Sequence, residues 1–190
     1  MSEQFTMLKT NDEVRRRIAE LAVTVSKDYS ETVTADNPLL VLCTLRGAVF
    51  FSADLVRSIT VPIELDFLKV HSYQGTRPAG IPVFDLGEKI NVSGRHVLIV
   101  EDIVDTGQTM RTVLSRFREQ GAASLRICTM LDKPSRRFPE CRSIVPEYIG
   151  FSIPDLFVVG WGLDYDEQFR LLPDIMVYHP EAAAKDPHTR

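Results

Sequence analysis

The residues from Val97 to Thr109, VLIVEDIVDTGQT, decide the fold class of this chain. The first four are apolar, as in a strand that is buried on both faces of a sheet. Three carboxylates follow within five positions, and Gly107 then marks a tight loop. Beyond the loop, apolar residues recur with the spacing of an amphipathic helix at Met110, Val113, Leu114 and Phe117. The segment therefore predicts a buried strand, a tight loop and a helix.

Strand and helix patterns also alternate along the rest of the chain. Thr10 and Glu13 form a capping-box pattern, and apolar residues at helical spacing follow them as far as Val25. A second helix is expected between Gly47 and Ile59. Runs typical of strands cover residues 39–44, 61–70, 125–131, 148–151, 157–159 and 175–178. This alternation predicts an α/β fold in which a central, mostly parallel sheet is flanked by helices.

The length and net charge of the chain indicate a single domain and argue against some classes of partner. The chain has 190 residues, which suits one domain, and its net charge of -4 argues against nucleic acid or an anionic membrane as a partner. Residues 1–17 are polar and lack the apolar core of a secretion signal, and the apolar run 38–45 is too short to span a membrane. Cys43, Cys128 and Cys141 have no CxxC spacing, and two of them lie in apolar stretches, which favours small buried thiols in a reducing cytoplasm.

The acidic residues Glu101, Asp102 and Asp105 lie close together in the sequence, and their negative charges repel one another. Like charges about 4 Å apart repel by roughly 4 kcal/mol at an effective dielectric of about 20, so a cation or sugar hydroxyls must offset them. Directly afterwards come a glycine, two hydroxyls and the N–H groups of a new helix, which suit a phosphate. A phosphorylated sugar satisfies both features. The alternative, in which Asp105 and Thr106 only cap the helix, accounts for one carboxylate.

This segment resembles the ribose-phosphate signature of the type I phosphoribosyltransferases, and the chain from about residue 10 to residue 178 is similar to their hypoxanthine (hypoxanthine-guanine) branch. The resemblance implies one domain, 1–190, with a small hood contributed by about 1–35 and 150–180. It implies transfer of ribose 5-phosphate from phosphoribosyl pyrophosphate to N9 of hypoxanthine or guanine, with xanthine a further candidate. The products would be IMP or GMP together with pyrophosphate. The cofactor would be Mg²⁺, and the protein would form a homodimer or homotetramer.

The resemblance assigns roles within the signature. Glu101 and Asp102 would hold the ribose hydroxyls and a magnesium ion, and Asp105 would move the N7 proton of the purine. The 5-phosphate would be bound by Thr106, Gly107, Gln108 and Thr109. Many relatives have Lys in place of Gln108, a change that should matter little if backbone N–H groups make the contact. Gly107 is expected to let the backbone approach the phosphate closely.

Pyrophosphate would be bound at two further places. Leu45, Arg46 and Gly47 match the pyrophosphate loop, in which relatives often have Lys at the position of Arg46 and the peptide bond entering it is cis. A plain strand-to-helix turn is the alternative for these residues. Arg170 matches an arginine that grips pyrophosphate, and Asp164 matches the ligand of a second magnesium ion.

Recognition of the base would rest on four more residues besides Asp164. Lys133 matches the lysine that donates to the purine O6, although a solvated loop lysine is the alternative. Phe157 matches the aromatic residue that stacks on the base, Val158 would read the base through its backbone, and Ile103 would adjoin it. Since Lys133 has donors and no acceptor, the site should favour 6-oxopurines over adenine.

Residues 71–95 form a long irregular stretch with six glycines and prolines. Such a connection is usually functional, although an ordinary surface excursion is the alternative. Ser72 and Tyr73 match the start of the family's mobile loop, which closes over the reacting centre and excludes water.

Three other functions are compatible with parts of the pattern. A phosphoribosyltransferase for adenine, orotate or uracil shares the signature but would not need Lys133 together with Phe157. A nucleic-acid-binding regulator on the same fold would be expected to carry a basic face or an added module. A signalling receiver domain resembles residues 96–133, but it needs an Asp and a Lys on separate strands, whereas Asp132 and Lys133 are adjacent.

Overall fold

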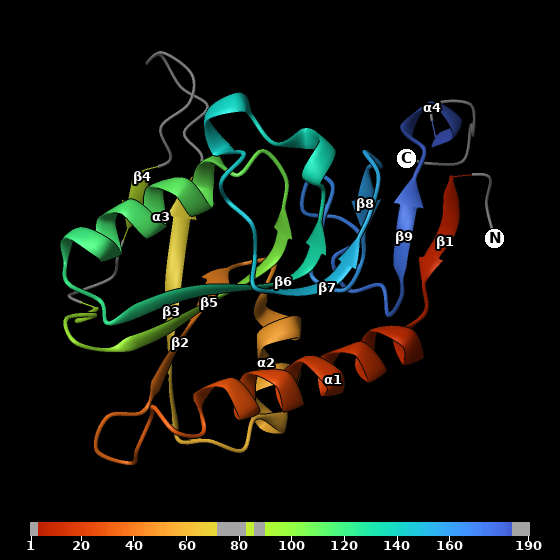
Figure 1. The fold of residues 1–190 in the computed structure, drawn as a ribbon. Coiled ribbons are helices and arrows are strands. Elements are labelled where there is room, and N and C mark those ends of the chain that lie inside the picture. The colour runs from red at the N-terminus through yellow and green to blue at the C-terminus, as the bar shows by residue number, and fades with distance from the viewer. Residues whose placement is uncertain (1–3, 72–82, 86–89, 184–190) are drawn as a thin grey trace.

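The computed structural model describes residues 4–71, 83–85 and 90–183, and a six-stranded sheet with the order β4-β3-β2-β5-β6-β7 forms its centre (Figure 1). The strands are β2 (Leu39–Leu45), β3 (Ile63–His71), β4 (Val83–Asp85), β5 (His96–Val104), β6 (Ser124–Asp132) and β7 (Tyr148–Ser152). Strands β3, β2, β5, β6 and β7 pair in parallel, and β4 is antiparallel at the edge. The predicted α/β class with a mostly parallel sheet is confirmed.

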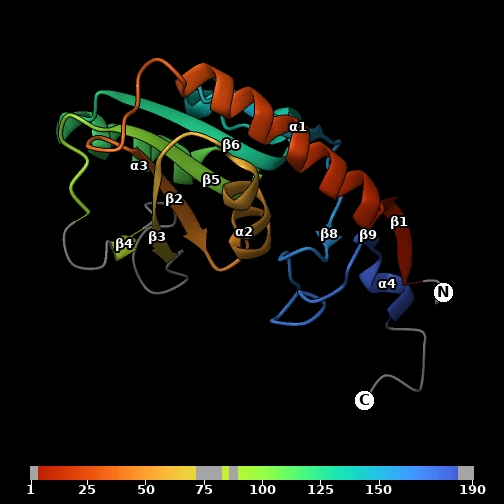
Figure 2. The ribbon, with the colours of Figure 1, turned by 90° about the horizontal axis from the view of Figure 1, so that it is seen from below.

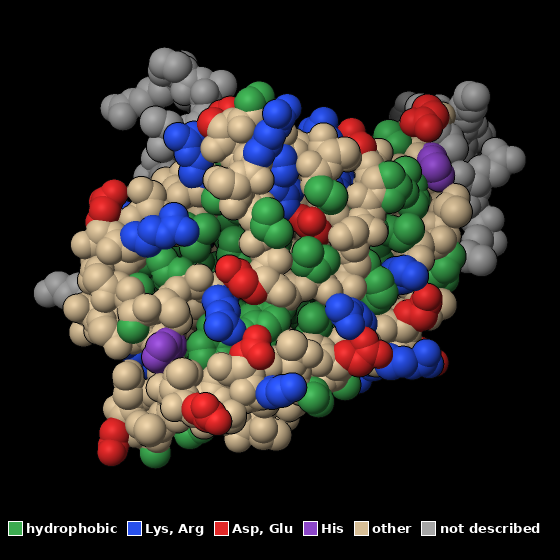
Figure 3. All heavy atoms as spheres, viewed as in Figure 1, with side chains coloured by type: hydrophobic (Ala, Val, Ile, Leu, Met, Phe, Trp, Pro, Cys, Tyr) green, Lys and Arg blue, Asp and Glu red, His purple; other side chains and the backbone are tan. Residues whose placement is uncertain are grey.

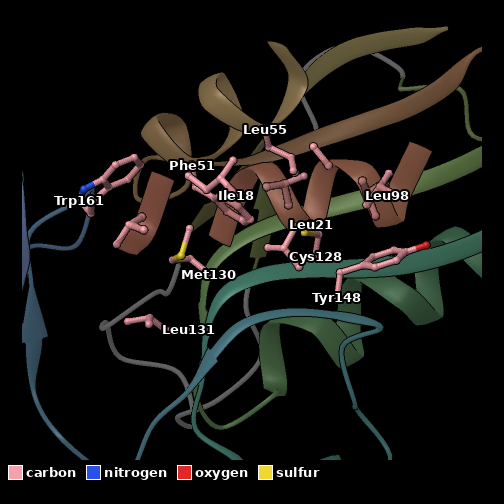
Figure 4. Packing of buried hydrophobic residues seen from close by; sticks show 14 of the residues in the cluster. Ile18, Leu21, Phe51, Leu55, Leu98, Cys128, Met130, Leu131, Tyr148 and Trp161 are labelled. Carbon is pink, nitrogen blue, oxygen red and sulfur yellow. The ribbon is translucent and has the colours of Figure 1, made fainter. Parts of the chain in front are cut away.

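Helices cover both faces of this sheet. The helices α1 (Asn11–Tyr29) and α2 (Val49–Ser58) lie on one face, and α3 (Gln108–Glu119) lies on the other (Figures 1 and 2). Because successive strand residues point to opposite faces, Leu98 packs with α1 and α2 whereas Ile99 packs with α3. Figure 4 shows the first of these cores, in which Phe51 and Ile18 approach the sheet from the two helices. The continuous apolar runs of the central strands therefore reflect burial on both faces.

The start of α1 is set by the predicted capping box. The Glu13 N–H lies 3.3 Å from Thr10 Oγ1, and the Thr10 N–H donates to Glu13 Oε2 over 2.9 Å. The hydrogen bond from the Thr10 backbone, with further help from Lys9, lowers the pKa of Glu13 to about 2. The two residues thus satisfy N–H groups that a helix otherwise leaves without partners at its first turn.

A second, antiparallel sheet is built from the two ends of the chain. Its strand order is β1-β9-β8, with β1 spanning Phe5–Lys9, β8 Val158–Val159 and β9 Ile175–Tyr178. A short helix, α4 (Pro180–Ala183), follows β9, and two 3-10 turns, Pro134–Arg136 and Pro139–Cys141, follow β6. The small additional unit expected from the chain ends is therefore present, although no sequence pattern predicted β1.

Strand β5 is longer than its apolar run predicts. It continues beyond Val100 to Val104, and Ile103 and Val104 pair with Leu131 and Asp132 of β6. The extension places Glu101 and Asp102 within the strand rather than in the loop. A polar residue can continue a strand where the neighbouring strand offers backbone partners, which a hydrophobicity pattern does not show.

The positions of the charged side chains and of the cysteines agree with what the composition indicated. Basic and acidic side chains are mixed over the face in Figure 3, without a continuous basic surface on the residues drawn there. Cys43, Cys128 and Cys141 are all free and buried, whereas burial was predicted for two of them, and burial raises the pKa of the Cys43 thiol to about 11. Within the described ranges, no helix combines the length and apolar composition that crossing a membrane requires.

Candidate active site

A cleft of about 460 Å³ opens at the carboxyl ends of β2 and β5. Three separate segments form its walls. They are residues 44–47 at the end of β2 and just beyond it, residues 101–107 with 109 and 110 at the end of β5 and the start of α3, and the group Asp164, Glu167 and Arg170. Ligands of open α/β sheets bind outside the carboxyl ends of the strands. The cleft brings together the predicted sugar, phosphate and pyrophosphate residues, apart from Gln108, from distant parts of the sequence.

The acidic pair Glu101 and Asp102 occupies the floor of the cleft. Burial, followed by the neighbouring charge of Asp102, raises the pKa of Glu101 well above its ordinary value. Asp102 Oδ1 accepts the Ile103 N–H over 2.8 Å. A divalent cation or sugar hydroxyl groups would offset the repulsion between these two carboxylates.

The donor set of this pair fits a magnesium site that is completed by substrate. Mg²⁺ prefers oxygen ligands and is commonly bound by one or two carboxylates together with substrate phosphates and water. In the part of the chain that the structure describes, no group of three or more His, Cys, Asp or Glu side chains forms a ready-made metal site. Asp164 is held separately, because its carboxylate pairs with Arg170 at 2.7 Å and accepts the Glu167 N–H at 2.9 Å.

The loop between β5 and α3 has the form expected of a phosphate cradle. Gly107 is the N-cap residue of α3 with φ 84°; the Gln108 N–H donates weakly to Thr106 Oγ1 over 3.5 Å, whereas the Asp105 carboxylate pairs with Arg136. Capping by Asp105 therefore does not explain the motif. A Cβ atom on Gly107 would lie 2.9 Å from Cys141 Cβ and 3.0 Å from Arg137 Cδ. The glycine is thus required by its left-handed backbone and by packing against Cys141 and Arg137, a reason that differs from the expected approach of a phosphate.

Arg137, which the sequence did not single out, holds this loop in place. Its buried guanidinium pairs with Asp132 and donates to the carbonyl oxygens of Asp105 and of Val104, the latter over 2.7 Å. The Lys133 N–H also donates to the Val104 carbonyl, over 3.0 Å. The loop after β6 therefore supports the loop after β5. An arginine that directly follows another arginine, Arg136, resembles a surface residue in sequence, so no pattern could have identified its role.

A chain of charges connects Asp105 to Lys133. Arg136 Nε lies 3.1 Å from Asp105 Oδ1, and Arg136 Nη1 lies 3.5 Å from Asp155 Oδ2. Lys133 Nζ lies 3.9 Å from the other Asp155 oxygen. The Lys133 side chain is only 7% exposed, so it is not a solvated loop lysine. Arg136 and Asp155 were also missed by sequence reasoning, because their contacts join loops that the sequence separates.

Arg46 and Arg170 face the cleft from opposite segments, and Glu167 joins them. Arg46 forms an ion pair with Glu167, and Arg170 Nη2 lies 3.2 Å from Glu167 Oε2. Arg170 Nη1 also donates to the Gly162 carbonyl over 2.5 Å. The peptide bond between Leu45 and Arg46 is cis, as the family resemblance implied. Glu167 was not among the predicted site residues.

Two glycines bring the walls of the cleft into close contact. A Cβ atom on Gly47 would lie 1.6 Å from Asp102 Oδ2, and one on Gly162 would lie 2.0 Å from the Gly47 carbonyl oxygen. Gly162 also has φ +101°, which side chains rarely adopt. The loop after β2 is therefore packed between the acidic strand and the segment that carries Arg170.

The residues predicted for base binding lie partly outside the cleft. Ile103 and Asp164 line it, whereas Lys133, Phe157 and Val158 do not. Phe157 is 49% exposed, and its ring contacts those of Tyr165 at 5.6 Å and Tyr178 at 6.2 Å, so about half of this side chain remains open to solvent. Val158 is buried in β8. Ser72 and Tyr73 fall outside the residues that the structure describes.

Comparison with known proteins gives a consistent result. Residues 4–168 match the family model described as the phosphoribosyl transferase domain. The hypoxanthine-guanine phosphoribosyltransferase of Streptococcus pneumoniae is 43% identical over 92% of this chain and 93% of its own length. The hypoxanthine phosphoribosyltransferase of Haemophilus influenzae is 44% identical over 87% and 90%. The Trypanosoma cruzi hypoxanthine phosphoribosyltransferase in complex with IMP superposes with a TM-score of 0.84 at 37% identity, covering 95% of this chain and 96% of that one.

Proposed function

This chain belongs to the hypoxanthine phosphoribosyltransferase family, and on that premise we propose that it transfers ribose 5-phosphate from phosphoribosyl pyrophosphate to N9 of hypoxanthine or guanine. The products are IMP or GMP and pyrophosphate, which makes the enzyme a pentosyltransferase of purine salvage. Xanthine is a third candidate base. Membership of this family excludes the receiver-domain alternative.

One observation carries the proposal. A single cleft of about 460 Å³ combines an acidic pair, the N-terminus of a helix and two arginines. These features match the three parts of phosphoribosyl pyrophosphate, which are the ribose hydroxyls, the 5-phosphate and the pyrophosphate. A simple nucleotide-binding protein would need the phosphate loop but not the arginines on the opposite wall.

We assign the sugar and its phosphates as follows. Glu101 and Asp102 accept hydrogen bonds from the ribose hydroxyls. The 5-phosphate receives the N–H groups of the loop and first turn at Thr106, Gly107, Gln108 and Thr109. The pyrophosphate is bound by the loop Leu45, Arg46 and Gly47 and by Arg170, whose planar guanidinium suits two phosphate oxygens.

The chemical step is a displacement at carbon 1 of the sugar. The bond from carbon 1 to the pyrophosphate oxygen breaks while the bond from carbon 1 to N9 of the purine forms. Asp105 directly follows β5 and takes the proton that N7 gives up. Arg46 and Arg170 neutralise the charge that develops on the departing pyrophosphate.

The base is recognised by residues beside the cleft. Lys133 donates to O6, and the exposed face of Phe157 stacks on the ring. Val158 contacts the base through its backbone, while Ile103 and Asp164 adjoin it. Lys133 is buried, so a base without an acceptor at position 6 would leave its ammonium with only the long, 3.9 Å contact to the exposed Asp155.

Magnesium would be held by Glu101 and Asp102, with Asp164 serving a second ion. The metal supplies Lewis-acid charge neutralisation for the sugar hydroxyls and the pyrophosphate when it is bound. The five carboxylates and two guanidinium groups of the cleft support this assignment, because a polyanionic substrate would otherwise meet a net negative wall.

Four further expectations complete the proposal. Ser72 and Tyr73 begin a loop that closes over the reacting centre. The sheet of β1, β9 and β8 belongs to a hood over the base. The enzyme works in the cytoplasm, on small-molecule substrates, without nucleic acid or membrane. It assembles as a homodimer or homotetramer.

A panel of bases tests the proposal. Purified protein is incubated with phosphoribosyl pyrophosphate, Mg²⁺ and one of hypoxanthine, guanine, xanthine, adenine, orotate or uracil, and nucleotide formation is measured. We expect turnover with hypoxanthine or guanine and little or none with the last three. Turnover restricted to adenine, orotate or uracil would contradict the assigned base site, and no turnover with any base would contradict the enzymatic function.

A further inference from the structure

Glu167 lies where the two proposed pyrophosphate arginines meet. Its carboxylate forms an ion pair with Arg46 through Oε1 and contacts Arg170 Nη2 through Oε2, at 3.2 Å. Each guanidinium is therefore engaged by one oxygen of the same carboxylate. This is the arrangement that an oxyanion of a phosphate would adopt between two arginines.

The turn that carries Glu167 holds it in this position. Asp166 and Glu167 have φ of 50° and 62°, in the left-handed region that side chains other than glycine rarely adopt. The Glu167 N–H donates to Asp164 Oδ2 over 2.9 Å, and the Tyr165 and Gln168 backbones pair across the turn. Local hydrogen bonds thus stabilise a backbone that aims the carboxylate at the arginines.

We infer that Glu167 is an internal stand-in for pyrophosphate: its carboxylate occupies Arg46 and Arg170 in the free enzyme and must be displaced when pyrophosphate binds. The inference rests on the proposed function, because it takes these two arginines as the pyrophosphate ligands. Glu167 is then a positioning residue. It holds the Arg46 guanidinium in the cleft between turnovers, contacts that of Arg170, and competes with the product for both.

Exposure of the ion pairs makes this competition reversible. The side chains of Arg46 and Glu167 are 66% and 58% exposed, and ion pairs this accessible to water are weak. Pyrophosphate carries more charge than one carboxylate and offers several oxygens, so it can replace Glu167. The internal carboxylate therefore lowers the affinity for pyrophosphate without preventing binding, which favours release of the product.

The effect should fall mainly on Arg46. Arg170 keeps its 2.7 Å ion pair with Asp164 and its bond to the Gly162 carbonyl when Glu167 is neutralised. Among the described residues, the ion-pair partner of Arg46 is Glu167. Glu167→Gln should consequently free Arg46 for an incoming anion and leave Arg170 in place.

Titration calorimetry with pyrophosphate in the presence of Mg²⁺ tests the inference. We expect Glu167→Gln to tighten pyrophosphate binding by about 2–5-fold, the range that one weak exposed ion pair can supply. Binding of IMP should stay within about twofold of wild type. Asp166→Asn is the matched control: it removes the same charge from the neighbouring left-handed residue and should change neither affinity.

A double variant identifies the contact. If Glu167 acts through Arg46, Glu167→Gln should have no effect on pyrophosphate binding in an Arg46→Gln background. An unchanged or weaker affinity of Glu167→Gln, or a gain equal to that of Asp166→Asn, would overturn the inference. The proposed function fails differently: wild-type protein would then neither bind pyrophosphate nor form nucleotide from any oxopurine.

Discussion

Replacing Lys133 with Met tests base recognition with little other change. The substitution keeps an unbranched apolar stem and removes the ammonium group. Lys133 is buried, and its Nζ lies 3.9 Å from Asp155 Oδ1. Asp155 is 58% exposed and keeps its contact with Arg136, so losing the lysine leaves no buried carboxylate without a partner. We therefore expect Lys133→Met to fold with nearly the stability of the wild type.

The size of the effect follows from the bond that is removed. A hydrogen bond to a charged group contributes about 1.5–3 kcal/mol. Since each 1.36 kcal/mol corresponds to a factor of ten, losing the bond to O6 should lower kcat/KM for hypoxanthine roughly 10–150-fold. Wild-type protein should show little or no turnover of adenine. The residual activity of Lys133→Met should discriminate less against adenine, because the buried donor that rejects it is gone.

The assay is kcat/KM for hypoxanthine and for adenine at saturating phosphoribosyl pyrophosphate. Lys27→Met, in the last turn of α1 and remote from the cleft, controls for the loss of a lysine charge and should leave both values unchanged. Phe157→Ala should weaken all bases alike by about 1–3 kcal/mol, because stacking is insensitive to the group at position 6. Full efficiency and full selectivity in Lys133→Met would refute this account of base recognition.

Three other substitutions probe the remaining parts of the site. Asp105→Asn should lower kcat about 10²–10⁴-fold while phosphoribosyl pyrophosphate still binds; near-normal turnover in a rapid-quench assay would remove Asp105 from proton transfer. Gly107→Val introduces a Cβ 2.9 Å from Cys141 Cβ at φ 84°, so calorimetry should show a lost preference for IMP over inosine, and a thermal melt a lower Tm. Gly162→Ala places a Cβ 2.0 Å from the Gly47 carbonyl oxygen and should weaken pyrophosphate binding more than IMP binding; equal losses would place the strain elsewhere.

The core of the fold could be predicted because burial leaves a pattern in the sequence. Strands β2, β5 and β6 are buried on both faces, and their apolar runs show it. The start of helix α1 was predictable from the capping-box residues Thr10 and Glu13. Strand β1 could not be predicted, because its residues are exposed or half-buried and its only described partner is β9, about 170 residues away along the chain. Long-range pairing of this kind is decided by tertiary structure rather than by local preference.

The part of the site whose residues are neighbours in the sequence could be predicted. Glu101, Asp102 and Asp105 adjoin the phosphate loop along the chain, so their chemistry could be inferred from the sequence alone. The pyrophosphate wall is assembled from distant segments, and Glu167 reaches Arg46 across 121 positions. The sequence of residues 164–170 does not show whether the Glu167 carboxylate competes with substrate or only faces water. That distinction depends on a left-handed turn, and the conformation of a turn without glycine is hidden from sequence patterns.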